Sequence, residues 1–345
     1  MKLTSIPKID HFELLNILNF YKALEIVYLK KKEETMKKFS IAIHGGAGTL
    51  VKGMMTPEKE KAYKQALNEA LNAGYAILEN GGSAMDAIEA AVMSLEDCHL
   101  FNAGRGSVFT SAGTHEMDAS IMDGQTRKAG AVSLITGIKN PVRLARDVME
   151  KSEHVFMAGT GAMEFAKMNG HEVLSADYFY DEFRHNQWLE IKDSESFQLD
   201  HAAKKDSKFG TVGAVACDQY GNIAAATSTG GMTNKKYGRV GDSPMIGAGN
   251  YANNATCAVS CTGSGEYFIR GVVAYDVACL IEHKHYSLQE ATEEVIQKRV
   301  LELGGDGGLI AVNSSGDVSF SFNTEGMYRG YKSSDGNESV MIYND

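Results

Sequence analysis

The 345-residue sequence contains no run of about 18 apolar residues, the length that a membrane-spanning helix requires. Positive charge is also in deficit, since 34 Lys and Arg face 44 Asp and Glu and the formal net charge is -10. We therefore expect no general attraction to nucleic acid or to an anionic membrane, and neither is predicted as a partner. A small neutral or zwitterionic ligand held by local charges stays open.

Cysteine and proline are scarce as well. The five cysteines include no C-x-x-C pair, so the sequence predicts neither a disulfide framework nor a zinc knuckle and favours a reducing compartment. The N-terminus shows no secretory pattern, and we expect a cytoplasmic protein. Four prolines against 36 glycines indicate many tight backbone positions rather than proline-rich linkers.

Parts of the chain differ in composition. Residues 1–38 mix apolar and charged residues, and we interpret them either as an added helix or as sequence that precedes a true start at Met36. The remainder has the make-up of one structural domain. Within it, residues 171–209 are polar, dotted with aromatic residues and without a steady period, which favours a mobile linker over a packed element.

Periodicity and capping residues predict the main elements. Phe39–Ile43 is an apolar β-prone run that leads into glycines and indicates a buried strand. Thr56 and Pro57 begin a helix that Gly81 and Gly82 end, and Ser83 with Asp86 resembles a capping box for a second helix. We also predict helices at 141–151, 160–169, 266–283 and 288–303, strands at 155–158, 309–312 and 318–322, and a hairpin about residues 218–222.

The order of these elements favours an α+β fold with sheets inside and helices outside over a strictly alternating parallel sheet.

Several familiar catalytic motifs are missing. Val51 stands where the dinucleotide fingerprint needs its third glycine, and Met54 occupies the lysine position of a Walker loop. The sequence has no H-E-x-x-H motif, no calcium-loop pattern and no G-x-S-x-G elbow. Nucleotide binding, a catalytic metal and a serine nucleophile are therefore not predicted, and no catalytic cofactor is expected.

The Gly210–Thr211 bond stands where the polar segment meets a β-prone run. A mid-chain threonine hydroxyl is a poor nucleophile, but a cut here would give Thr211 a free α-amino group with a reference pKa of about 8 as its own base. Gly210 has no side chain to block attack on its carbonyl, and β-branched Thr211 has few χ1 choices. On composition alone, a strand that simply opens with Gly-Thr is the more common explanation.

Three long motifs change that balance. They are HGGAGT at residues 44–49, FNAGRGSVFTSAGTHEMDASIMDG at residues 101–124, and the stretch 210–270, which begins GTVGAVACDQYGNIAAATSTGG. In this order they resemble the isoaspartyl peptidase/L-asparaginase family, the plant-type asparaginases among the N-terminal nucleophile hydrolases. The resemblance covers the chain from about residue 39 to its end. It implies a four-layer αββα sandwich of the N-terminal nucleophile hydrolase type.

The resemblance also implies that the precursor cleaves itself at the Gly210–Thr211 bond. The products are an α subunit, residues 39–210, and a β subunit, residues 211–345, which assemble as (αβ)2. Thr211 matches the family's nucleophile, and Thr229 matches the threonine whose hydroxyl orients it. The implied reactions are hydrolysis of L-asparagine to L-aspartate and ammonia and cleavage of β-aspartyl dipeptides, both small-molecule substrates.

Further positions match the family's substrate contacts. Arg239 and Asp242 match the pair that binds the α-carboxylate and the α-ammonium group, which suits a guanidinium fork and a carboxylate. Thr262 and Gly263 match the donors that stabilise the oxyanion, and losing such a donor costs about 10² to 10³ in rate. The full set of implied substrate-binding positions is Asn102, Arg239, Val240, Gly241, Asp242, Thr262, Gly263, Ser264 and Gly265.

The loop from residue 95 to residue 105 resembles the family's sodium-binding loop, in which main-chain carbonyls hold a structural ion. Carbonyl ligands leave almost no side-chain pattern, so this site follows from the resemblance alone. The matching positions are Leu95, Glu96, Cys98, Phe101, Ala103 and Arg105.

Two other functions stay open at this point. The related glycosylasparaginases usually carry an acidic residue in the Thr-Gly-x-Gly loop, where this chain has Ser264. Outside the enzymes, the chain could be an uncleaved protein that binds asparagine or aspartate, although binding alone does not require Thr211, Thr229 and Thr262 together. A protein-cutting threonine endopeptidase is disfavoured, since the Arg and Asp pair suits a free amino-acid terminus.

Overall fold

The computed structural model describes residues 21–22, 38–193 and 210–344. The chain divides into two compact units, residues 1–37 and residues 38–345, and the elements below all belong to the second. The helix expected within residues 1–38 lies almost wholly outside the described residues. Among the helices that the structure describes, none has both the length and the apolar character needed to cross a membrane.

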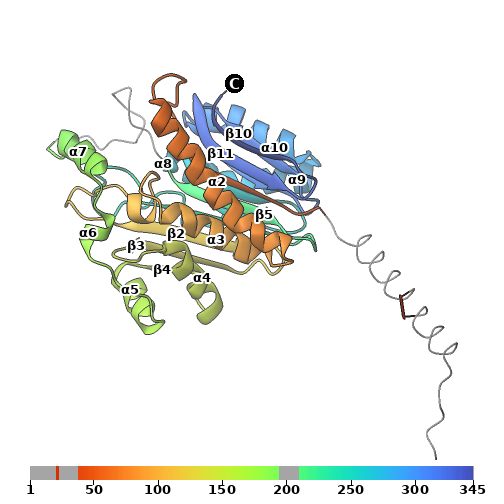
Figure 1. The fold of residues 1–345 in the computed structure, drawn as a ribbon, viewed down its shortest axis with the longest axis horizontal. Helices are drawn as coiled ribbons and strands as arrows, with labels where there is room; N and C mark the ends of the chain where they lie inside the picture. Colours follow the sequence, from red (N-terminus) through yellow and green to blue (C-terminus); the bar gives the residue numbers. More distant parts are fainter. Residues whose placement is uncertain (1–20, 23–37, 194–209, 345) are drawn as a thin grey trace, which may run out of the picture. The chain divides into compact units, whose positions relative to one another are not determined.

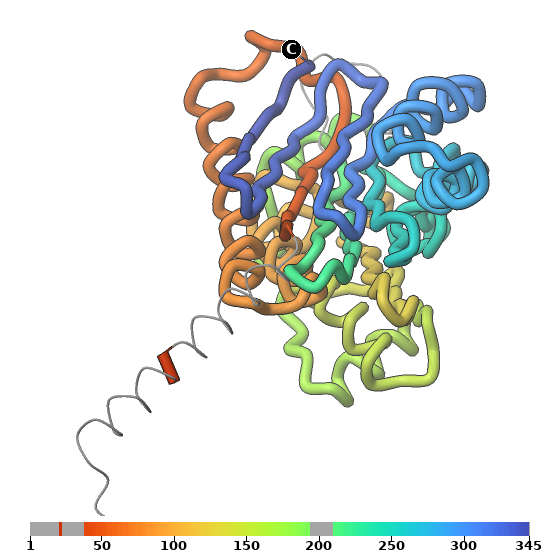
Figure 2. Tube along the Cα trace, turned by 90° about the vertical axis from the view of Figure 1, so that its right-hand side faces the viewer, coloured from red at the N-terminus to blue at the C-terminus, as the bar shows by residue number. Residues whose placement is uncertain are grey.

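The larger sheet of the second unit has eight strands in the order β12-β11-β1-β5-β6-β2-β3-β4, antiparallel except between β3 and β4. Figure 2 shows the C-terminal strands, in dark blue, beside β1, in orange, so the two ends of this unit meet in one sheet. The strands are β1 (Ser40–Gly48), β2 (Met117–Asp123), β3 (Ala129–Ile135), β4 (Phe156–Ala158), β5 (Val212–Cys217), β6 (Ile223–Thr229), β11 (Gly326–Ser333) and β12 (Glu338–Tyr343).

The smaller sheet has four antiparallel strands in the order β10-β9-β8-β7. One of its faces is covered by helices whose buried side chains, such as Val277 and Ile296, pack against Val259 and Leu309 of the sheet. The strands are β7 (Asn250–Ala252), β8 (Ala258–Gly263), β9 (Gly307–Val312) and β10 (Val318–Phe322), and the helices are α8 (Gly265–Gly271), α9 (Val273–Lys284) and α10 (Leu288–Glu294), which continues into a π-helical turn at Val295–Val300.

Side chains of the central strands alternate between two cores, as the two-residue period of a strand requires. Ile41 and Ile43 of β1 belong to the core beneath the helices of the larger sheet. Ala42 of β1 and Val215 of β5 belong to a second core, which also contains Ile310 of the smaller sheet. The two sheets therefore pack against each other through this second core.

Helices also cover the other face of the larger sheet, and Figure 1 shows α2 and α3 lying along it. Local caps begin two of them as predicted: Thr56 accepts from Lys59 N at 3.3 Å, and Ser83 accepts from Asp86 N at 3.1 Å. These helices are α2 (Pro57–Glu79), α3 (Ala84–Glu96) and α4 (Pro141–Lys151), and α5 (Gly159–Met168) follows β4.

The prediction that residues 171–209 lack packed elements is wrong for their first part. Helices α6 (Ala176–Phe179) and α7 (Glu182–Ile191) form there, and Phe179, Arg184 and Ile191 are buried. The apolar residues are divided between two short helices, so no single period runs through the segment. Residues 194–209 lie outside the described residues.

Two other predicted boundaries need correction. The strand at Phe39–Ile43 continues through the glycines to Gly48, with an irregular register after His44. The helix predicted at 266–283 is two helices, because Val272 between them has a φ of +47°, which ends the first helix in a left-handed turn. The capping box at Ser287, by contrast, is present as predicted.

Candidate active site

Neighbouring strands β5 and β6 bring Thr211 and Thr229 together. Their register pairs Val212 with Ser228, so Thr211 and Thr229 are the next opposed residues. The Thr211 hydroxyl donates to Oγ1 of Thr229 at 3.1 Å. Because the Gly231 amide also donates to that oxygen, at 3.0 Å, Thr229 is held as an acceptor for the Thr211 hydroxyl.

Gly210 lies where the main chain at Gly46 and the side chain of Thr262 approach it closely. A Cβ atom on Gly46, whose φ is +113°, would stand 2.5 Å from the nitrogen of Gly210. A Cβ atom on Gly210 itself would stand 2.9 Å from Oγ1 of Thr262. Glycine at both positions therefore lets the Gly210–Thr211 bond lie beside Thr262 without a steric clash.

A small cavity of ≈ 30 Å³ lies beside the Thr211 hydroxyl. Six of the nine predicted substrate-binding positions line it. Val240 lies between two lining residues, a Cβ atom on Gly265 would stand 2.9 Å from Oδ1 of Asp242, and the Ser264 hydroxyl donates to Asp306. The lining residues are Ala47, Asn102, Gly210, Thr211, Thr229, Gly231, Met232, Arg239, Gly241, Asp242, Ser243, Thr262 and Gly263.

Two buried polar atoms at this cavity have no hydrogen-bond partner within the described residues, Oγ1 of Thr262 and Oδ2 of Asp242. Burial raises the pKa of Asp242 to about 7, although the nearby Arg239 lowers it. Leaving a buried polar group unpaired costs about 1–3 kcal/mol, and native structures contain few such groups. Their presence here indicates groups kept for a ligand.

Arg239 presents its guanidinium fork to Glu266. Nε donates to one carboxylate oxygen and Nη2 to the other, each at 2.9 Å, and the side chain of Glu266 is 49% exposed. The same fork can bind the carboxylate of a ligand in two places. Glu266 therefore occupies the donors that a ligand carboxylate would use.

Asn102 holds the turn that follows Thr229. Its side chain donates to the carbonyl of Gly231 at 2.7 Å, its own carbonyl accepts from the Gly230 amide at 3.0 Å, and its side-chain oxygen accepts from the Val108 amide at 3.1 Å. These bonds fix the turn whose amide at Gly231 donates to Thr229.

Three polar side chains at the site were not singled out from the sequence, and neither were the lining residues Ala47, Gly231 and Met232. The Ser243 hydroxyl lies 3.3 Å from Oγ1 of Thr211, Glu266 binds Arg239, and His44 contacts the carbonyl of Thr211. All three stand inside the segments that carry the family resemblance, His44 in HGGAGT and the other two in the stretch 210–270. Their place in those motifs was the only sign of their position.

The predicted sodium loop follows α3. A Cβ atom on Gly104 would stand 2.4 Å from the Glu96 carbonyl oxygen, and one on Gly106 would stand 2.1 Å from that of Phe101, so these glycines make room for converging carbonyls. The buried side chain of Glu96 accepts from Ser228 at 2.6 Å and from Val142 N at 3.0 Å, and burial raises its pKa to about 8.

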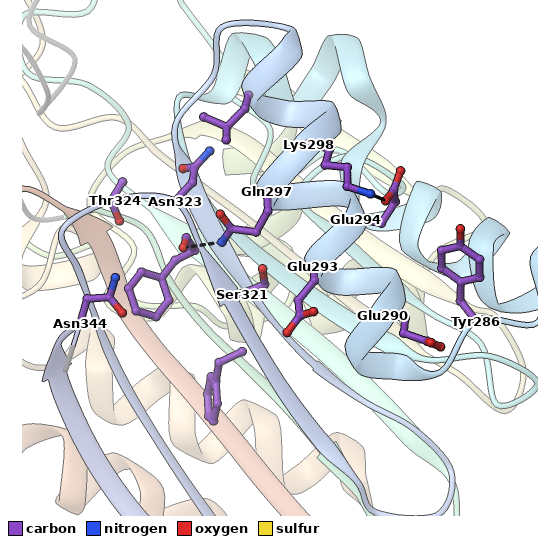
Figure 3. A pocket seen from close by; sticks show the side chains of 13 residues that line it. Tyr286, Glu290, Glu293, Glu294, Gln297, Lys298, Ser321, Asn323, Thr324 and Asn344 are labelled. Carbon is purple, nitrogen blue, oxygen red and sulfur yellow. Dashed lines mark hydrogen bonds and ion pairs between the residues drawn. The ribbon is translucent and has the colours of Figure 1, made fainter.

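A much larger cavity of ≈ 870 Å³ lies between α10 and β10 (Figure 3). Glu294 there pairs with Lys298, and Gln297 donates to the Phe322 carbonyl at 2.8 Å. The hydroxyl of Ser321 is buried and has no partner among the described residues. No nucleophile stands beside a base in this cavity as far as the structure describes it, so its size alone does not indicate chemistry.

Comparison with known proteins matches a region that contains all the residues of this site. Residues 36–342 match the protein-family model described as Asparaginase. The chain is 52% identical over 299 residues to the isoaspartyl peptidase of Salmonella typhimurium, covering 86% of this chain and 96% of that protein.

Relatives at lower identity come from other organisms. The isoaspartyl peptidase/L-asparaginase of Homo sapiens is 43% identical over 277 residues, which is 80% of this chain and 87% of that protein. The plant-type L-asparaginase of Pyrobaculum calidifontis is 42% identical over 295 residues, 85% of this chain and 96% of that protein. With a family model matched along most of its length and relatives of this identity, the chain belongs to the asparaginase family.

Proposed function

We propose that this chain is an autoproteolytically activated threonine hydrolase that converts L-asparagine to L-aspartate and ammonia and cleaves β-aspartyl dipeptides. The observation that supports it most is the Thr211 hydroxyl, which donates to Thr229 at the edge of a cavity with two unpartnered polar atoms. The names of the relatives, isoaspartyl peptidase and L-asparaginase, support the same substrates.

Activation is an N-to-O acyl shift at the Gly210–Thr211 bond. The Thr211 oxygen attacks the Gly210 carbonyl carbon, the C–N bond breaks as a C–O ester bond forms, and the hydroxyl proton ends on the Thr211 nitrogen. Water then hydrolyses the ester, which leaves a carboxylate on Gly210 and a free amine and hydroxyl on Thr211. The products are the α subunit, residues 39–210, and the β subunit, residues 211–345.

Turnover uses the new N-terminus. The α-amino group, with a reference pKa of about 8, takes the Thr211 hydroxyl proton as the oxygen attacks the substrate's side-chain carbonyl. The amino group then gives this proton to the leaving amine, and a β-aspartyl ester stays on Thr211 until water releases aspartate. Thr229 orients the attacking hydroxyl, and the Thr262 hydroxyl and the Gly263 amide stabilise the oxyanion.

Substrate recognition depends on a free amino-acid head group. Arg239 turns from Glu266 to bind the α-carboxylate, and the Asp242 carboxylate accepts from the α-ammonium group. Asn102 and Gly241 complete the lining, beside Val240, Ser264 and Gly265 of the same loops. A peptide bond inside a protein chain offers no such head group, so the site does not suit protein substrates.

The same proposal extends to the surroundings of the site. The two packed sheets with their covering helices fit the four-layer αββα sandwich of N-terminal nucleophile hydrolases, and the mature subunits assemble as (αβ)2. A structural sodium ion fits the converging carbonyls of the loop after α3, where Gly104 and Gly106 leave room for them. The ion would hold that loop, through the carbonyls of Leu95, Glu96, Cys98, Phe101, Ala103 and Arg105.

The test is a side-by-side assay of asparagine, a β-aspartyl dipeptide and a glycosylated asparagine with the cleaved protein. We expect the first two to be hydrolysed. A strong preference for the glycosylated substrate would assign the chain to the glycosylasparaginase type instead. Tight binding of asparagine or aspartate by a chain that never cleaves would identify a binding protein.

A further inference from the structure

A line of buried hydrogen bonds runs from the smaller sheet to the carbonyl of Thr211. Asn250 Nδ2 donates to Oγ1 of Thr227 at 3.3 Å, and this oxygen lies 2.7 Å from Oγ of Ser260. Ser260 Oγ lies 2.8 Å from Nε2 of His44, and Nδ1 of His44 lies 3.0 Å from the Thr211 carbonyl oxygen. All four side chains are fully buried, and the line joins the two sheets.

The Thr211 carbonyl oxygen at the end of this line determines which atoms along it carry hydrogens. A carbonyl oxygen only accepts, so Nδ1 of His44 must carry a hydrogen to bond Thr211. Burial lowers the pKa of His44 to about 3, which leaves the ring neutral and Nε2 bare. Nε2 must then accept from the Ser260 hydroxyl, whose oxygen accepts from Thr227, while the Thr227 proton is shared with the Gly249 carbonyl at 3.1 Å.

A glycine in β5, the strand that follows Thr211, leaves space for these hydrogen bonds. Gly213 of β5 lies opposite His44 of β1. A Cβ atom on Gly213 would stand 2.0 Å from Oγ of Ser260 and 2.5 Å from Nε2 of His44, closer than any side chain could approach. Glycine at this position therefore lets the imidazole and the serine hydroxyl meet directly under Thr211.

We propose that His44 is a positioning residue for the nucleophile. Held as the Nδ1–H tautomer by Ser260, it fixes the carbonyl of Thr211 and thereby the orientation of the Thr211 hydroxyl, both for self-cleavage and for turnover. His44 touches neither the scissile carbonyl nor the cavity, so it acts only through Thr211. This inference rests on the proposed role of Thr211.

Two substitutions separate this hydrogen bond from simple filling of space. In His44→Asn, the side-chain amide nitrogen can take the place of Nδ1 and still donate to Thr211, although the residue is smaller. In His44→Gln, the size is closer to that of histidine, but the amide reaches toward Ser260 and the donor to Thr211 is lost. If His44 only fills space, the Gln variant should cleave itself faster than the Asn variant. If His44 positions Thr211, the Asn variant should be the faster one.

The measurement is the rate of self-cleavage of freshly purified precursor, followed on gels. We expect His44→Asn to cleave within about threefold of the natural protein, and His44→Gln and His44→Ala to cleave about tenfold more slowly or worse, the effect of one lost hydrogen bond. The matched control is His171→Asn, which removes an imidazole paired with Asp147 of α4 and is expected to cleave normally. Equal rates for Asn and Gln, or faster cleavage with Gln, would overturn the inference.

A second readout does not depend on cleavage or on the stability of the His44 variants. In the Thr211→Ala precursor, labelled with ¹⁵N on histidine, the ring of His44 should carry its hydrogen on Nδ1 across neutral pH. His115, whose Nδ1 lies 3.0 Å from the Ser107 carbonyl oxygen, should give a second such signal, which His115→Gln identifies by removing it. A hydrogen on Nε2 of His44, or a ring that gains charge near pH 6.5, would contradict the proposal. If the natural protein does not cleave at Thr211, the proposed function is wrong. The tautomer of His44 in the Thr211→Ala precursor tests the His44 inference independently of that outcome.

Discussion

The cavity beside Thr211 and the cavity between α10 and β10 differ in what their polar groups do. The first is ≈ 30 Å³ and the second ≈ 870 Å³. In the larger cavity, Glu294 and Lys298 are already paired with each other, and the hydroxyl of Ser321 is the single unpartnered buried atom among its described lining residues. In the smaller one, Thr262 and Asp242 each bury an atom that no described residue satisfies.

The comparison shows that volume does not locate the chemistry of this protein. A site must hold polar groups in fixed positions without letting them satisfy one another, and this has a cost in stability that only a ligand offsets. The larger cavity holds an ion pair and one isolated hydroxyl, so it does not gather unpartnered polar groups beside a nucleophile as the smaller one does. Substitutions at four positions test this contrast.

Substitution of the nucleophile should have the largest effect. Thr211→Ala removes the hydroxyl that attacks both the Gly210 carbonyl and the substrate, so we expect no self-cleavage and a loss of turnover of at least about 10⁴-fold. Thr211→Ser keeps a hydroxyl without the γ-methyl group and should retain part of both. Gels and ammonia release measure the two outcomes, and full activity in the alanine variant would exclude the mechanism.

Next in size is the loss of one unpartnered hydroxyl. Thr262→Val keeps the shape of the side chain and removes the donor proposed to stabilise the oxyanion, so kcat should fall by about 10² to 10³. The matched control, Thr262→Ser, keeps the hydroxyl and should lose much less. A valine variant with the kcat of the natural protein would show that Thr262 does not contact the reacting oxygen.

A smaller, pH-dependent effect is expected at Asp242. Its pKa of about 7 means that the carboxylate which accepts from the substrate ammonium is lost as the pH falls through 7, and kcat/KM should fall with it. In Asp242→Asn, kcat/KM at pH 8 should be about 10-fold to 100-fold lower, through KM, and this part of the pH profile should disappear.

Stability should change in the opposite direction in the same variant. Burial raises the pKa of Asp242, so the ionised form destabilises the folded state increasingly as the pH rises from about 4 toward 7. Asp242→Asn, which has no charge, should therefore unfold at a higher temperature than the natural protein at pH 8 in the absence of ligand. A lower melting temperature at pH 8 would contradict this account.

The smallest effect is expected in the larger cavity. Ser321→Ala removes a buried hydroxyl that has no partner among the described residues, and no reacting group lies near it. Self-cleavage, kcat and KM should stay within experimental error, and the melting temperature should stay equal or rise slightly. A loss of turnover in this variant would erase the contrast between the two cavities.

Elements set by neighbouring residues were predictable from the sequence. Thr56 and Ser83 cap α2 and α3 through bonds to amides three residues ahead, and Ser287 forms its capping box in the same way. The hairpin of β5 and β6 was predicted from its turn, and its register alone places Thr211 opposite Thr229.

Features set by tertiary packing were not predictable in this way. Helices α6 and α7 owe their place to the burial of Phe179 and Ile191, which no local period reports. The cavity joins Thr211 to residues near 102, 239 and 262, and only the resemblance to a known family connected those segments. The contact of His44 with Ser260 needs the packing of two sheets, so it appears only in the structure.

The most direct test of the account is the intact mass of the active protein. A sample that releases ammonia from asparagine should contain two chains, of which the smaller spans residues 211–345 and begins with an unblocked threonine. The rate of ammonia release by the sample should be proportional to the fraction of the chain that has been cut. Full turnover from a sample in which mass spectrometry detects only the uncut chain would contradict the central claim.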